Sequence, residues 1–156
     1  QIKNNRSFFR ENEYLENCRA FSSAVYSSGA KLEDIGKEEL SCWYDYIWDN
    51  GYYFKKYYSV DDAVSTAQSN QSYNISQVES DDLEISSLYS SIISSPIADS
   101  KKSRITSIVK DVYDDYEEMY DSILEPEGNY SNFKGTYNSC DSNLADSLQD
   151  LSDAIQ

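Results

Sequence analysis

Carboxylates are the side chains of this sequence with the most potential for chemistry, and they are densest between residues 111 and 121. This run contains six acids interleaved with tyrosines: Asp111, Asp114, Asp115, Glu117, Glu118 and Asp121. On a helix several of these acids stand one turn apart, close enough to share a hard cation such as calcium. A calcium loop, however, needs a glycine turn and alternating oxygen ligands, which this segment lacks. We therefore interpret the run as the solvated face of a helix and predict neither a metal site nor a cofactor.

Catalysis by paired carboxylates or by histidine is the next kind of chemistry to consider. Two carboxylates can cleave a glycoside when burial raises the pKa of one of them, but the sequence singles out no pair for that role. Histidine is absent, which excludes serine–histidine and cysteine–histidine nucleophile systems and histidine-ligated metals. We predict that the protein is not an enzyme and has no catalytic residues.

The three cysteines, Cys18, Cys42 and Cys140, form no C-x-x-C motif and fall at apolar positions of the expected helices. A cysteine at such a position most often behaves as a small buried apolar side chain. The alternative is a disulfide between Cys18 and Cys42, which requires the chain to fold back near Gly29. We expect three buried thiols.

Aromatic side chains make up 14% of the chain and are densest between residues 43 and 58. If this segment is helical, one group fits the apolar stripe: Trp43, Ile47, Phe54 and Tyr57. A second group falls partly outside that stripe: Tyr44, Trp48, Tyr52 and Tyr58. Tyrosine and tryptophan combine a large contact area with few rotatable bonds, so we predict that the second group binds a protein partner. The alternative is that these rings only cover the helices as amphipathic boundary residues. Lys55 and Lys56 could hold an acidic group of the partner.

The charge of the chain restricts its partners further. Acidic residues number 28 and basic residues 13, which gives a net charge of −15 over 156 residues. A polyanion would be repelled by such a chain, so we predict no binding to nucleic acid or to an anionic membrane surface. No apolar run approaches the roughly 20 residues that span a bilayer, so we predict no direct membrane insertion by this segment.

Helices must position all of these side chains, because apolar residues recur at intervals of three and four almost throughout. The two prolines, Pro96 and Pro126, lie where helices should begin or end. We predict one all-α domain over residues 1–156, an antiparallel bundle of long helices. The expected helices span about 8–57, 60–69, 76–95, 99–124 and 130–155. The loop between the last two is short, so those helices should pack antiparallel.

The first helix is the least certain element in length. Its apolar stripe runs from Phe8 to Tyr57 without loss of phase, which favours a single helix, but the glycines at 29 and 36 could break it there. The chain begins at Gln1 with a polar stretch. We therefore expect residues 1–7 to be a disordered linker to an absent N-terminal signal or anchor.

Four segments follow one another in a familiar order: Trp43 to Ile47, Asp62 to Val64, Tyr113 to Tyr116, and Pro126 to Phe133. In this order they resemble a loose group of helical, lipoprotein-like extracytoplasmic proteins of Gram-positive bacteria. Members of that group have a long tryptophan-containing helix, a short helix opening on aspartate, and a final hairpin turned by proline, glycine and phenylalanine. The resemblance covers about residues 41–155 and implies a helical fold and an extracytoplasmic location. The group has no assigned activity, so the resemblance implies no site residue.

These observations together predict a non-enzymatic extracytoplasmic helical domain, secreted or anchored at the cell surface, that binds a protein partner near Trp48 to Tyr58. The alternative is a cytoplasmic acidic inhibitor, immunity or phage-encoded protein, whose acidic surface would be the working part. A glycan-binding or glycan-active protein is the third hypothesis, and glycan cleavage would require two acids that converge in a pocket.

Overall fold

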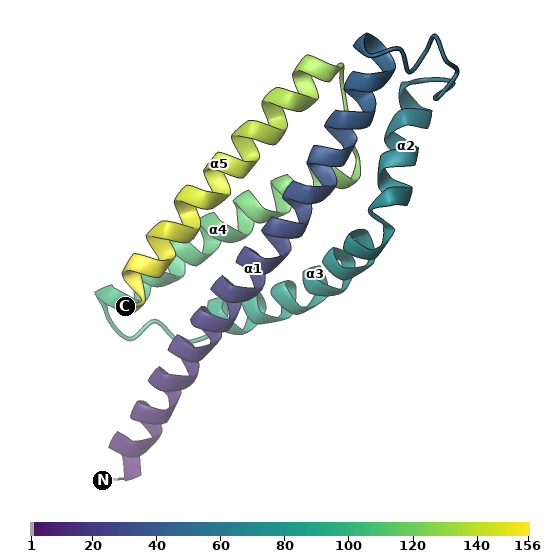
Figure 1. Cartoon of the computed structure of the whole chain (residues 1–156). Coiled ribbons are helices and arrows are strands. Elements are labelled where there is room, and N and C mark those ends of the chain that lie inside the picture. Colours follow the sequence, from purple (N-terminus) through teal and green to yellow (C-terminus); the bar gives the residue numbers. More distant parts are fainter. Residues whose placement is uncertain (1) are drawn as a thin grey trace.

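The computed structural model describes residues 2–156, except for the side chains of residues 2–5 and 7–9. These residues fold into five helices: α1 (Ile2–Trp48), α2 (Val60–Asn70), α3 (Ser72–Ile93), α4 (Ser100–Leu124) and α5 (Tyr130–Ala154). Helix α1 packs against all four others, with the α4–α5 hairpin on one side and α2 and α3 on the other (Figure 1). The prediction of an all-α helical bundle is confirmed.

Helix α1 is a single helix of 47 residues, and the break considered near residues 29–36 does not occur. The two glycines there mark close helix packing. A Cβ at Gly36 would lie only 2.5 Å from a ring carbon of Tyr137 on α5, and one at Gly29 would lie 3.2 Å from Leu144. A glycine inside a helix costs about 1 kcal/mol relative to alanine, and here the missing side chain lets α5 approach α1.

The predicted end of the first helix near residue 57 is wrong, because α1 ends at Trp48. Beyond it, the backbone oxygen of Asp45 accepts hydrogen bonds from the N–H groups of Asp49 and Gly51, at 3.1 and 2.9 Å. Between these two residues Asn50 takes a left-handed conformation with φ of 69°, which ends a helix. The chain then runs as an irregular loop to residue 59.

The early end of α1 overturns two predicted core positions. Ile47 and Phe54 are exposed, because the first lies in the last helical turn and the second in the loop. Tyr57 is buried as predicted, but the loop carries it there, into a small cluster with Cys42, Ala63 and Ala67.

The other end of α1 also differs from the prediction, since the helix begins at Ile2 and not near residue 8. Its first turns extend beyond the other helices (Figure 1). Among the described side chains, the first buried one is Tyr14, whose hydroxyl lies 2.7 Å from that of Thr106 on α4. The side chain of Phe8, the first residue of the predicted stripe, lies outside the described residues.

The remaining helices lie close to their predicted bounds, and local capping explains where they start. Ser59 caps α2 by accepting from the N–H of Asp62, and Asp99 caps α4 by accepting from the N–H of Lys102. Asn129 and Asn132 form a reciprocal capping box at the start of α5. Only the third helix shifts by more than one or two residues: it starts at Ser72, directly after the break at Gln71, and not near residue 76.

All three cysteines are buried and unbridged, as expected. Cys18 and Cys42 lie 24 positions apart on one continuous helix, which separates them by about 36 Å at 1.5 Å per residue. The alternative of a disulfide between them is therefore excluded. No helix within residues 2–156 is long and apolar enough to cross a membrane.

Candidate functional site

The end of the bundle where α1 stops and α5 begins carries a group of aromatic rings anchored on the core. Trp43 is only 4% exposed and stacks on Phe133 of α5, with ring centroids 5.7 Å apart and planes 18° apart. On this base lies a half-exposed group of three rings. Trp48 meets Tyr130 edge to face at 5.0 Å and lies 5.1 Å from Tyr44. The packed rings fix each other's positions while leaving one side open to solvent.

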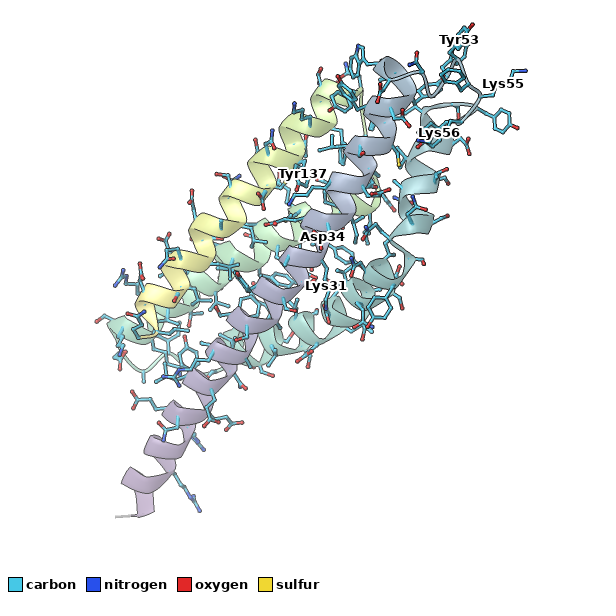
Figure 2. The ribbon with its side chains drawn as sticks, in the orientation of Figure 1. Lys31, Asp34, Tyr53, Lys55, Lys56 and Tyr137 are labelled. Atoms are coloured by element: carbon cyan, nitrogen blue, oxygen red, sulfur yellow. The ribbon has the colours of Figure 1, made fainter. Side chains whose placement is uncertain are left out.

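The loop after α1 presents further aromatic side chains. We define the aromatic end as the six exposed rings of this region together with the partly buried Tyr130: Tyr44, Trp48, Tyr52, Tyr53, Phe54, Tyr58 and Tyr130. Figure 2 shows Tyr53 and Lys55 at the outer edge of the loop, pointing away from the helices. Tyr53 and Phe54 meet edge to face at 5.3 Å.

Several contacts hold this loop in one shape. The N–H groups of Phe54 and Lys56 donate to the carbonyl oxygens of Asn50 and Gly51, at 3.0 and 2.8 Å. Lys56 forms an ion pair with Asp45 on the last turns of α1. A Cβ at Gly51 would lie 2.8 Å from the backbone oxygen of Asp45, so only glycine allows the loop to pack this closely. The exposed rings are therefore presented from a hydrogen-bonded frame.

The structure places the four predicted site residues on this end and divides them. Tyr44 and Trp48 contact each other on α1, whereas Tyr52 and Tyr58 lie on the loop. Tyr52 meets the ring of Tyr46 edge to face at 6.0 Å. Tyr58 is 84% exposed.

The sequence-based prediction missed three contributors to the aromatic end, and one of them is Tyr53 of the loop. Tyr130 was treated only as part of the hairpin turn, and Phe54 was assigned to the core. The signal for Tyr130 was its place directly after the helix cap Asn129, at the same end of an antiparallel hairpin as the loop. Lys56 is paired with Asp45, so of the two neighbouring lysines only Lys55 points out of the loop (Figure 2).

An open groove of about 700 Å³ lies beside the aromatic end and is lined by α1, by Thr66 and Asn70 of α2, and by the loop. Its lining includes side chains of both charges: Lys37, Glu38, Asp45, Asp49 and Lys56. Small-molecule sites of this size are mostly apolar and enclosed, whereas this groove is polar and open, as a contact surface for a protein is. Tyr44 and Tyr130 line it too, which joins the groove to the aromatic end.

The cysteine beside this groove is poorly suited to act as a nucleophile. Burial raises the pKa of Cys42, and the carboxylate of Glu38, 3.6 Å from its Sγ, opposes ionisation further. Burial also raises the pKa of Cys18, to about 11, and that of Cys140. A reactive cysteine needs an accessible thiolate, and none of these three environments favours one.

The acidic run of α4 does not form a cluster. Most of its carboxylates are exposed, and Glu117 turns toward α3, where it meets Asp82. Asp115 and Glu118 lie near enough to Cys140 of α5 for their negative charges to disfavour its thiolate. A second carboxyl pair, Glu33 and Asp141, lies between α1 and α5, and Glu39 is fully buried. Among the described side chains no three acids or cysteines converge as metal ligands would.

Comparison with known proteins assigns no function to this chain, so its function must be inferred from the residues described above. No protein-family model, no curated protein and no solved structure matches this chain.

Proposed function

We propose that this protein is a non-enzymatic, extracytoplasmic helical domain that binds a protein partner through the aromatic end. The observation that carries the proposal is a set of exposed rings on a braced loop: Tyr52, Tyr53, Phe54 and Tyr58 are all more than 70% exposed. Large apolar side chains that remain exposed together on one end of a protein often mark an interaction site.

The fixed shape of the aromatic end supports binding to a protein. Rings that are already held in place lose little conformational entropy when a partner covers them, and tyrosine and tryptophan are enriched among the residues that dominate binding energy. Trp48 suits a central position, because it contacts both Tyr44 and Tyr130 and is 56% exposed. The polar groove beside the aromatic end adds hydrogen-bonding and charged groups at the rim of the same surface.

The chemistry of the chain favours a binding role over catalysis. The groove is lined neither by the Glu33–Asp141 pair nor by the Asp82–Glu117 pair, so these acids do not face a substrate there. The order of segments that resembles lipoprotein-like proteins of Gram-positive bacteria is the reason for placing the domain outside the cytoplasm.

The test is capture of a partner by the full chain from separate envelope and cytosolic fractions of the organism that produces it. We expect a specific partner from the envelope fraction, and we expect replacement of Tyr44, Trp48, Tyr52 and Tyr58 by alanine to abolish its capture. A photo-crosslinking residue at Tyr53 should form a covalent adduct with the same partner. Circular dichroism checks that the variant is folded.

A matched control removes exposed apolar side chains elsewhere on the bundle: Tyr26, Tyr73 and Leu83. This control should bind the partner as well as the unchanged protein does. Capture that survives the fourfold replacement would overturn the site. A partner found only in the cytosol, and bound through the acidic face of α4, would favour the acidic inhibitor instead.

A further inference from the structure

Glu39 is a buried carboxyl group on α1, and one of its two oxygens has no hydrogen-bond partner. It is 0% exposed, and its Oε2 accepts a hydrogen bond from the Gln68 amide of α2 at 3.0 Å. The same Gln68 nitrogen also donates to the backbone oxygen of Leu124 at the end of α4. The Oε1 atom of Glu39 is buried without a partner. A buried anion in this position is strongly unfavourable, and a neutral carboxylic acid costs much less.

Asp82 and Glu117 form the second such place, across the interface between α3 and α4. Each carboxyl group has one oxygen that is buried and unpartnered, Oδ1 of Asp82 and Oε1 of Glu117. Two carboxylates cannot donate to each other, so the contact becomes a hydrogen bond only when one of them holds a proton. The groups around Glu117 are Asp82 from α3 and Asp121 and Tyr113 from its own helix. Lys31 of α1 pairs with Asp81, the residue before Asp82 on α3.

Glu33 and Asp141 form a more open contact of two carboxyl groups between α1 and α5, in which both side chains are half-buried. Glu33 lies within hydrogen-bonding reach of Asp141, while Lys37 and Asp34 of its own helix act on it more weakly and with opposite signs. The described side chains form two ion pairs, Lys31–Asp81 and Lys56–Asp45, and neither includes Glu33 or its partner. Three helix interfaces therefore contain a carboxyl group that the fold accommodates best in its neutral form.

We infer that the folded bundle takes up protons at Glu39 and at the carboxyl pairs Asp82–Glu117 and Glu33–Asp141, which makes the fold more stable at mildly acidic than at alkaline pH. Each of these places lies between different helices, so a proton bound there stabilises the contact between them. This property is independent of the proposed partner.

The pH range follows from the environment of each group. Burial raises the pKa of Glu39 to about 8. The hydrogen bond with Asp141 is the main cause that raises the pKa of Glu33 to about 7, and burial and Asp82 raise that of Glu117 to about 7. In the unfolded chain all three return to about 4.3, so between about pH 4.5 and 8 the folded state binds more protons. The free energy of unfolding must then fall as the pH rises through this range.

The absence of histidine makes the effect easy to measure. Without histidine, no side chain with an unperturbed pKa titrates between pH 5.5 and 8, and the α-amino group is the one other group that does. Proton uptake in this range therefore reports the carboxyl groups whose pKa is raised. The experiment is refolding of the full chain from urea in weakly buffered solution at pH 6, with the protons taken up counted by a pH-stat. We expect nearly three protons per chain, and a urea midpoint that falls steadily from pH 5.5 to 8.5.

Glutamine imitates a neutral glutamic acid, so Glu39→Gln, Glu117→Gln and Glu33→Gln should each remove about one proton from the uptake and raise the urea midpoint at pH 8.5 more than at pH 5.5. The matched control is Glu118→Gln, which removes one charge from the exposed side of the same helix as Glu117 and should leave the uptake unchanged. The inference is overturned if refolding takes up no protons at pH 6. It is equally overturned if Glu118→Gln alters the uptake as much as Glu117→Gln.

Discussion

The core of the bundle and the aromatic end are both rich in tyrosine and tryptophan, but they hold these side chains in opposite ways. In the core, Tyr116 is completely buried and its hydroxyl lies 3.1 Å from that of Ser28 on α1. The hydroxyl of Tyr137 donates to the backbone oxygen of Glu33. At the aromatic end, Trp48 and Tyr58 are mostly exposed. The number of helices around a ring, and not the type of ring, decides whether it stabilises the fold or remains free to bind.

The two tryptophans give the sharpest test of this comparison. They lie only five positions apart on α1, but Trp43 belongs to the core and Trp48 to the aromatic end. Trp43→Ala should destabilise the protein by about 3–5 kcal/mol, since it removes a buried ring that stacks on Phe133. Trp48→Ala should cost about 1 kcal/mol or less, the value of its contacts with Tyr44 and Tyr130. Urea denaturation followed by circular dichroism measures both. Equal losses would show that the aromatic end is part of the core.

Two glycines test how tightly the core is closed. Gly36→Ala should destabilise the protein by about 1–3 kcal/mol, because the added methyl group meets Tyr137 and Ile123 of the facing helices. Gly135→Ala on the exposed side of α5 is the control, and it should stabilise the protein by about 0.4–1 kcal/mol, since nothing lies within 4 Å of the added atom. Thermal unfolding distinguishes the two. A harmless Gly36→Ala would mean that α1 and α5 are packed more loosely than the structure shows.

Removal of single hydroxyl groups gives the smallest expected difference. Tyr116→Phe should cost about 1–2 kcal/mol, because the fully buried Ser28 loses its partner. Tyr58→Phe should change the stability by less than about 0.5 kcal/mol, because that hydroxyl group lies in solvent. Chemical denaturation of both variants beside the unchanged protein is the measurement, and a loss at Tyr58 as large as that at Tyr116 would contradict the comparison.

Much of the helical framework could be predicted because the signals that set it are local. The period of the apolar residues, the prolines at 96 and 126 and the capping side chains Ser59, Asp99 and Asn129 act within a few residues of themselves. The prediction failed at the end of α1, where the apolar phase continues to Tyr57 although Asn50 and Gly51 end the helix. The loop brings Tyr57 back to a buried position, so Tyr57 is buried as it would be if the helix continued.

The candidate site was only partly accessible to such reasoning. The exposed position of Tyr44 and Trp48 followed from the helical phase, but the role of Tyr130 did not, because its contact with Trp48 joins α5 to α1. The prediction placed Phe54 in the core because it extended the first helix to residue 57, whereas α1 ends at Trp48. The acidic run between 111 and 121 gave no indication that Glu117 alone would face an acid on another helix.

The sequence by itself determined the class of fold and the absence of histidine chemistry, since these depend on composition and on residues within a turn or two of each other. It favoured a single first helix but left a break at residues 29–36 open, and only the structure decided that α1 is continuous there. Only the tertiary structure decided which aromatic rings are covered and which carboxyl groups meet. Both depend on neighbours that are distant in the chain, as Ser28 and Tyr116 are, 88 residues apart. Burial and the pKa of a carboxyl group are properties of the space around a side chain, and that space exists only once the helices have packed.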